Sequence, residues 1–133
     1  MKAEFTVPTS AREQMIDVTN LLRQTIEESG INDGIAFCHV PHTTAAITIN
    51  ENADPDVPRD ILSKLGREIP QSDGYRHAEG NSDAHIKSSL FGCSQQVLIE
   101  NGQPVLGRWQ SLFFCEFDGP RQRRLIIKVG KIA

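Results

Sequence analysis

The pattern of apolar and polar side chains predicts three short strands in the first part of the chain. Residues 4–7 alternate and stop at Pro8, which has no amide hydrogen to continue a ladder. Residues 35–40 are almost all apolar, which is typical of a strand buried on both faces. Residues 43–51 are rich in β-branched side chains, which favour strands.

Hairpins dominate the C-terminal half. Residues 96–100 and 104–106 flank Asn101-Gly102, a strong signal for a tight turn. Longer strand patterns follow at residues 109–117 and 124–131, joined by Asp118-Gly119-Pro120.

Helical periodicity occupies shorter stretches. From Thr19, a candidate cap, Leu22 and Ile26 lie four apart, and Gly30 is the expected stop. Residues 14–18 are ambiguous, because this helix could begin early. The other helix candidates are residues 55–65, with Asp54 or Asp56 as cap, and residues 82–90, which end at Gly92.

These elements predict an α+β fold, because strands outnumber helices and hairpins are frequent. We expect antiparallel or mixed sheets packed as in a β-sandwich, with two or three helices outside. A length of 133 residues favours one domain over residues 1–133, and the sequence contains no linker or repeat.

Composition and charge narrow the classes of function. Apolar residues at 38% and charged residues at 23% are typical of a globular protein. A net charge of −3 gives the whole molecule no electrostatic reason to bind nucleic acid or an anionic membrane. No segment approaches the roughly 20 apolar residues of a membrane span. The N-terminus lacks a signal-peptide pattern, so we expect a cytoplasmic protein.

The cysteines and the single tryptophan favour core packing over chemistry. Cys38, Cys93 and Cys115 are widely spaced and form no CxxC pair, so we expect buried thiols. Trp109 stands at the head of a predicted strand, where packing in the core is the usual role.

Residues 42–51 have one strand face that is almost wholly polar. Its members are His42, Thr44, Ala46, Thr48 and Asn50. This face could be a solvated sheet surface. It could equally line a binding site or a subunit interface.

The four histidines suggest a second candidate site. His39 shares parity with Ile35 on a predicted buried strand, so we expect it in the core. His42, His77 and His85 come from three different elements and could converge as an open metal site. They could equally act as acid–base groups near neutral pH.

Charged residues surround the turn between the last two predicted strands. Glu116 and Asp118 share a strand face, and Arg121, Arg123 and Arg124 follow the turn. Arginine binds phosphate bidentately, so a small phosphorylated ligand is one hypothesis. The alternative is a surface rim in which opposite charges neutralise each other.

In order and spacing, these segments together resemble the YjbQ family, also described as secondary thiamine-phosphate synthases, over nearly the whole chain. The matching positions are His42-Thr43-Thr44-Ala45, Asn50-Glu51, Asp54-Pro55, Tyr75, His77, Gly80-Asn81, Ala84-His85, Lys87, Gly92, Gly102, Leu106-Gly107, Trp109-Gln110, Glu116-Phe117-Asp118-Gly119-Pro120-Arg121 and Arg123. Arg108 and Gln103 depart from residues common in the family, and Arg108 could alter the mouth of the site.

The resemblance implies a compact α+β homotrimer with sites near subunit boundaries. It also implies a secondary activity that joins a pyrimidine methyl diphosphate to a thiazole phosphate and releases pyrophosphate. Given that chemistry, the expected groups are phosphate and substrate ligands, catalytic carboxylates and a divalent metal, Mg²⁺ or Zn²⁺. We assign substrate binding to Thr43, Thr44, Asn81, Arg121 and Arg123, catalysis to Glu51 and Asp118, and metal binding to His42, His77 and His85.

Two other functions remain open. A hydrolase would hold zinc with the three histidines and activate water with Glu51 or Asp118. A trimeric module without catalytic activity would only bind a phosphorylated metabolite.

Overall fold

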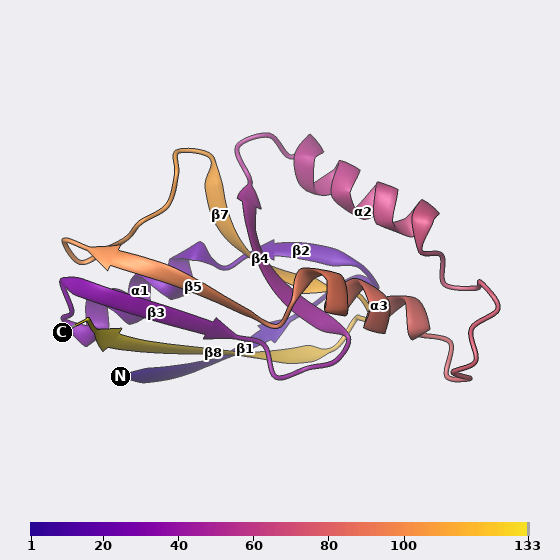
Figure 1. The fold of residues 1–133 in the computed structure, drawn as a ribbon, viewed down its shortest axis with the longest axis horizontal. Helices are drawn as coiled ribbons and strands as arrows, with labels where there is room; N and C mark the ends of the chain where they lie inside the picture. The colour runs from indigo at the N-terminus through magenta and orange to yellow at the C-terminus, as the bar shows by residue number, and fades with distance from the viewer. Residues whose placement is uncertain (133) are drawn as a thin grey trace.

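The computed structural model describes residues 1–132, which form two antiparallel sheets and three helices (Figure 1). The larger sheet has the order β1 (Lys2–Pro8), β8 (Gln122–Lys131), β3 (Asp33–His39), β5 (Ser94–Glu100) and β6 (Gln103–Pro104). The smaller sheet has the order β2 (Gln14–Asp17), β7 (Gln110–Glu116) and β4 (Ala45–Glu51). The helices are α1 (Thr19–Ser29), α2 (Asp56–Glu68) and α3 (Ser82–Phe91). The predicted α+β fold with packed sheets is confirmed.

The main hydrophobic core lies between the two sheets and α1. Leu22 and Ile26 of α1 are fully buried there. Ile47 of β4 and Phe114 of β7 approach from the smaller sheet, and Ile127 of β8 from the larger one. Burying large apolar side chains from every side provides most of the driving force for this packing.

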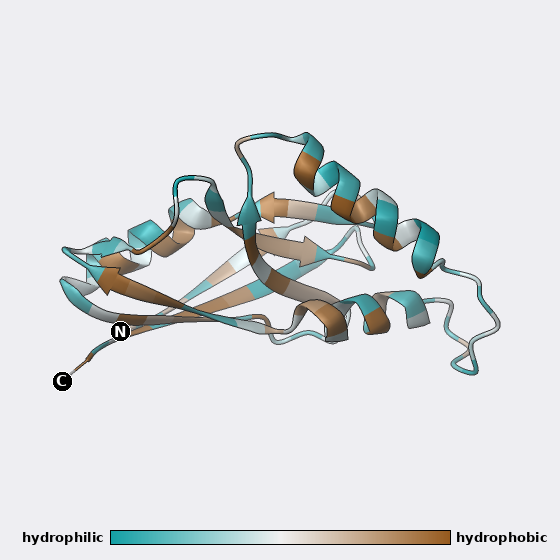
Figure 2. Ribbon diagram, turned by 45° about the horizontal axis from the view of Figure 1, so that its top comes forward, coloured by the Kyte–Doolittle hydropathy of each residue, from teal (hydrophilic) through white to brown (hydrophobic). Residues whose placement is uncertain are grey.

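A second, smaller core covers the other face of the smaller sheet, under α2 and α3. Phe113 and Phe117 are buried in it, and Phe91 of α3 meets Phe117 edge-on with ring centroids 5.4 Å apart. Helix α2 contributes Leu62 and Leu65, although none of its residues is buried. Figure 2 shows apolar positions on α2 interspersed with polar ones, as expected of a helix that covers a core on one side only.

The outer face of the larger sheet is uncovered, and this corrects two predictions. Strand β3 is buried on one face only, because no helix or sheet of residues 1–132 lies over Phe37, which is 46% exposed. His39 lies on the same face and is exposed instead of packed in the core. Leu98 of β5, 52% exposed, extends this apolar outer face.

Local hydrogen bonds adjust the predicted helix starts. Helix α1 begins at Thr19, but the Asp17 carboxylate is the group that accepts the Thr19 amide, at 2.9 Å. Thr19 instead donates its hydroxyl to Asp17 and accepts the Leu112 amide, which joins the helix to the smaller sheet. In α2 the N-cap residue is Pro55, not Asp54 or Asp56 as predicted, although the Asp54 carboxylate accepts the Asp56 amide at 2.9 Å.

Three further sequence predictions are resolved by the structure. The Asn101-Gly102 turn is confirmed, with φ of 52° and 71° at the two residues. Trp109 is 54% exposed beneath the Arg108 guanidinium, so its predicted core position is wrong. Cys38 and Cys115 are buried as expected, whereas Cys93 is exposed. No helix of residues 1–132 is long and apolar enough to cross a membrane.

Candidate functional site

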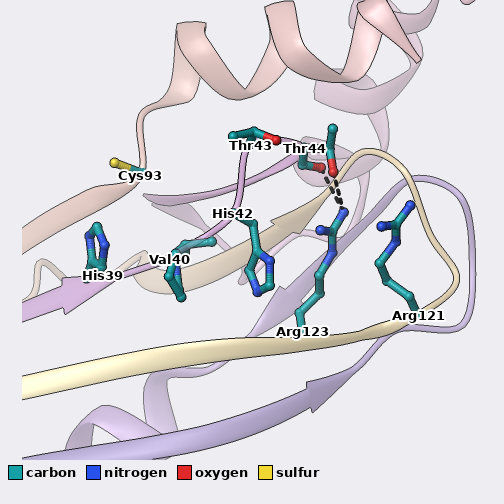
Figure 3. Close-up of a pocket in the computed structure, with 9 residues that line it drawn as sticks. His39, Val40, His42, Thr43, Thr44, Cys93, Arg121 and Arg123 are labelled. Atoms are coloured by element: carbon teal, nitrogen blue, oxygen red, sulfur yellow. Dashed lines mark hydrogen bonds between the residues drawn. The ribbon is translucent and has the colours of Figure 1, made fainter. Parts of the chain in front are cut away.

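A hollow of about 480 Å³ opens beside the loop that joins β3 to β4 (Figure 3). We call it the arginine hollow, and its polar lining comprises His39, His42, Thr43, Thr44, Cys93, Arg121 and Arg123. Strand β4 begins only at Ala45, so His42 and Thr44 lie in the loop and not on the predicted polar strand face. The start of β8 supplies Arg123, and Arg121 lies in the turn just before that strand.

Arg123 is buried, yet one end of it faces the hollow. Its Nε donates to both Glu116 carboxylate oxygens at 2.9 and 3.0 Å, and its Nη2 donates to Glu116 and to the Thr44 hydroxyl. Within residues 1–132 its Nη1 has no hydrogen-bond partner, and it is not among the buried unpaired atoms, so it reaches solvent. The Arg123 side chain is therefore held in one orientation, and its Nη1 amino group is free to donate to a ligand.

Glu116 holds Arg123 in place. Its carboxylate is fully buried and also accepts the Thr9 hydroxyl at 2.8 Å and the Asp118 amide at 3.1 Å. Burial alone would raise the pKa of this group, but the hydrogen bonds from Arg123, Thr9 and Asp118 outweigh burial and lower the pKa. Glu116 therefore stays ionised and keeps Arg123 in one orientation.

Arg121 is oriented by a chain of side chains at the rim of the hollow. Its Nε donates to the Asp118 carbonyl and its Nη2 to Asp118 Oδ2, both at 3.0 Å. The same Oδ2 accepts Asn81 Nδ2 at 2.8 Å. In this geometry Asp118 and Asn81 position Arg121.

His42 contacts β8 through one ring nitrogen. Its Nε2 accepts the main-chain N–H of Arg124 at 2.9 Å, so the single proton of the neutral ring lies on Nδ1. Burial and the nearby Arg123 lower the pKa of His42, which favours this neutral form. A lone pair already engaged by an amide is not free for a metal, so this geometry favours His42 as a hydrogen-bond donor.

The other two predicted metal ligands lie apart from His42. His77 and His85 approach each other edge-on, with ring centroids 5.4 Å apart. His85 also borders a hollow that reaches His42, so the three histidines follow one another along the surface. Within residues 1–132 no three His, Cys, Asp or Glu side chains gather closely enough to hold a metal ion. One chain does not assemble the three-histidine site by itself, and that site stays a prediction.

Glu51 is not brought to the hollow. It ends β4 and pairs with Gln110, whereas the hollow lies before the first residue of that strand, Ala45. A seven-residue strand spans about 20 Å at roughly 3.3 Å per residue. Glu51 therefore cannot act beside Asp118 within one chain.

A buried charge cluster anchors the first turns of α3. Asp83 is fully buried and accepts two hydrogen bonds from Arg12, both at 3.1 Å. Lys87, 1% exposed, donates to Asp83 at 3.0 Å and to Glu13 at 2.8 Å. Burial opposes ionisation of Asp83, but Arg12 and Lys87 lower its pKa. The cluster anchors the start of α3, next to Asn81, whose side chain bonds Asp118.

Sequence reasoning grouped Glu116 with the arginines but gave it no role in the site, and it missed Thr9 and the Asp83 cluster. A signal existed for Glu116, because a lone carboxylate interrupts the apolar run of β7 and must find a partner if it is buried. Thr9 had none, since its contact with Glu116 spans more than a hundred residues of chain.

Comparison with known proteins gives a consistent family. The family model described as UPF0047 protein YjbQ-like matches residues 3–131. The UPF0047 protein MJ1081 of Methanocaldococcus jannaschii is 53% identical over 97% of this chain and 94% of its own length. The UPF0047 protein YugU of Bacillus subtilis is 50% identical over 92% of this chain and 94% of its own.

Solved structures agree with the sequence matches. A YjbQ/UPF0047 family protein of Clostridium acetobutylicum superimposes with a TM-score of 0.95 at 55% identity, covering 96% of this chain and 99% of that one. A YbjQ-like protein of unknown function from Sulfolobus solfataricus also gives 0.95, at 30% identity, covering 99% and 97%. The chain therefore belongs to the YjbQ (UPF0047) family.

Proposed function

We propose that this chain is a cytoplasmic transferase that binds phosphate groups in the arginine hollow and joins a pyrimidine methyl diphosphate to a thiazole phosphate. The observation that carries the proposal is the convergence of donor side chains: Arg123, with its Nη1 unpaired within residues 1–132, Arg121 and His42 line one open hollow. Donors held in place before the ligand arrives stabilise charge without reorganisation.

The donor set matches the charge that the reaction develops. The bond between the pyrimidine methylene carbon and the diphosphate oxygen breaks, and the oxygen keeps the electron pair. The thiazole nitrogen donates its lone pair to that carbon, and pyrophosphate leaves. Arg123 and Arg121 would meet the growing charge on the leaving oxygens, while His42 and Thr43 would hold a second phosphate edge.

Of the two expected metals, Mg²⁺ fits the residues better than Zn²⁺. Magnesium is commonly held by one or two carboxylates together with substrate phosphates, and the Asp118 carboxylate is bonded to Arg121, which lines the hollow. A zinc hydrolase needs three protein ligands and an open position. His42 Nε2 already accepts a hydrogen bond, so the hydrolase alternative is less well supported by this chain.

A homotrimer is part of the proposal. The apolar outer face of the larger sheet, with Phe37 at 46% and Leu98 at 52% exposure, suits burial against another copy of the chain. Assembly would also give Glu51, which is remote from the hollow of its own chain, a route to the hollow of a neighbouring copy.

The direct test is to mix both substrates with Mg²⁺ and follow thiamine phosphate formation. We expect Arg121→Ala to slow the chemical step about tenfold, near the lower end for a charge-assisted hydrogen bond because the side chain is half exposed to solvent. Arg121→Lys should recover little, because an ammonium does not reproduce the planar fork. If the native protein forms no product but retains zinc tightly, the hydrolase hypothesis replaces the transferase hypothesis. If the protein binds phosphate but forms no product, the hypothesis of a binding module without catalytic activity is supported instead.

A further inference from the structure

A second hollow, of about 500 Å³, adjoins the arginine hollow. The two share His42, Thr43 and Cys93 as a common wall. The far wall of the second hollow is the surface of α3, with His85, Ser88 and Ser89, and we call it the serine hollow. A ligand larger than phosphate would therefore extend from one hollow into the other.

The two hollows differ in charge. The arginine hollow includes Arg121 and Arg123, whereas among residues 1–132 no Lys, Arg, Asp or Glu lines the serine hollow. A charged phosphate gains most beside the guanidinium groups, and an uncharged group loses least by leaving water in the other hollow. The two hollows together therefore suit a ligand that has one charged end and one uncharged end.

Ser88 lines the serine hollow and carries a buried hydroxyl without a partner in the described part of the chain. Its residue is only 8% exposed, and within residues 1–132 its hydroxyl has no hydrogen-bond partner. The neighbouring Ser89 differs, because its hydroxyl donates to the His85 carbonyl at 2.9 Å, the usual bond of a helical serine. A buried hydroxyl without a partner is unfavourable, so a ligand group that bonds Ser88 would be favoured.

Gly92 borders the serine hollow. It lies at the end of α3 with φ of 90°, and a Cβ built on it would meet no atom within 4 Å. A side chain there would project into the free space that the hollow provides. The positive φ disfavours other residues, so the backbone favours glycine at this position.

We infer that the serine hollow binds the uncharged, hydrogen-bonding organic group of a phosphomonoester whose phosphate lies in the arginine hollow. His42 and Thr43 stand at the junction, and Ser88 selects for a hydrogen-bonding atom on the organic group. This inference rests on the proposed function, because it assumes that the arginine hollow binds phosphate.

The test compares inorganic phosphate with thiazole phosphate by calorimetry on the native protein and three variants of α3. Ser89→Phe places a large side chain at the mouth of the serine hollow from an exposed position. Ser88→Ala removes the unpartnered hydroxyl, and Ser89→Ala is the matched control, since its hydroxyl is already bonded to the helix. We expect the ester to bind at least about tenfold more tightly than inorganic phosphate, and Ser89→Phe to abolish that preference without changing the affinity for inorganic phosphate. Ser88→Ala should weaken ester binding about threefold or more, and Ser89→Ala should leave it unchanged.

Cys93 provides an independent readout, since it borders both hollows and is exposed. Cys38 and Cys115 are buried, and burial raises the pKa of each to about 12, so an aromatic disulfide reagent reports on Cys93. We expect the ester to protect Cys93 more than saturating inorganic phosphate does. If phosphate binds but the ester gains nothing, or keeps its preference in Ser89→Phe, the serine hollow is not the organic compartment and the phosphate site stands. If neither ligand binds, the proposed function fails and this inference fails with it.

Discussion

His42 and Arg124 are joined by a hydrogen bond of 2.9 Å in which the imidazole Nε2 accepts a main-chain amide. A main-chain N–H can only donate a hydrogen bond, so Nε2 is the acceptor and the proton of the neutral ring lies on Nδ1. The bond turns the protonated Nδ1 into a donor and ties the loop before β4 to strand β8. The chemistry of the arginine hollow therefore depends on a backbone contact that the sequence does not reveal.

The first prediction concerns the protonation of His42. Because its pKa is lowered by burial and by Arg123, we expect a neutral Nδ1–H ring at pH 7, detected by long-range nitrogen–proton NMR correlations. The unfolded chain protonates this residue near its ordinary pKa of about 6.5. Stability from His42 is therefore complete above that value and is lost as pH falls through the lower folded pKa.

His39 is the control for this experiment, because it is exposed on the outer face of the sheet. A His42 ring protonated at pH 7, or neutral with its proton on Nε2, would contradict the hydrogen bond to Arg124 and the donor role built on it.

The second prediction separates His42 from the other two histidines. His42→Ala should weaken inorganic phosphate binding about tenfold, because a donor of the arginine hollow is lost. His77→Ala and His85→Ala should change it less than about twofold, since neither residue lines that hollow. Equal losses in all three variants, measured by calorimetry, would instead support the three-histidine site.

The third prediction concerns the buried Arg123–Glu116 pair. Glu116→Gln leaves a buried guanidinium without its counter-charge, so we expect a loss of about 3–5 kcal/mol in the free energy of unfolding in urea. The pKa of Glu116 is lowered, so the stability it provides is complete above the ordinary glutamate value and is lost as pH falls through the folded pKa.

Arg121→Ala is the matched control, because its partner Asp118 is at the rim and the Arg121 side chain is 49% exposed. It should leave stability nearly unchanged. If Glu116→Gln unfolds no more easily than Arg121→Ala, Glu116 does not hold Arg123 as described.

The fourth prediction tests Asp118 as a positioning group. Asp118→Asn removes the charge that holds Arg121 Nη2 but keeps a side chain that can still accept the Asn81 amide. We expect phosphate affinity to fall about threefold while stability is retained. Asn81→Ala should have the same direction of effect. A loss of more than a hundredfold in rate without a change in affinity would assign Asp118 a direct catalytic role instead.

Sequence patterns predicted elements far better than they predicted the environment of each residue. The turn at Asn101-Gly102 and the helix beginning at Thr19 follow from local chemistry, and both were found. Strand β3 was expected to be buried on both faces, but apolar composition cannot say whether a face is covered by the same chain or by another molecule. The structure brings Arg121 and Arg123 together with Thr44, because all three line one hollow. Glu51 was grouped with them by chemical type alone, and the length of β4 separates it.

The last prediction concerns the outer face of the larger sheet. Phe37 and Leu98 are half exposed on neighbouring strands, and in a homotrimer they would be buried. Phe37→Asp would place a carboxylate in an apolar interface, which is strongly unfavourable without a partner. Light scattering at micromolar concentration should therefore show three chains for the native protein and monomers for Phe37→Asp.

Leu90→Asp is the control, because Leu90 is also apolar and is 65% exposed, but lies on α3. A folded Phe37→Asp monomer that still binds inorganic phosphate would locate the subunit contact on the sheet and the arginine hollow within one chain. If the native protein is monomeric, the trimer hypothesis is wrong, and Glu51 then has no route to the hollow of a neighbouring chain. Dissociation of Leu90→Asp but not of Phe37→Asp would move the contact to α3, next to the serine hollow.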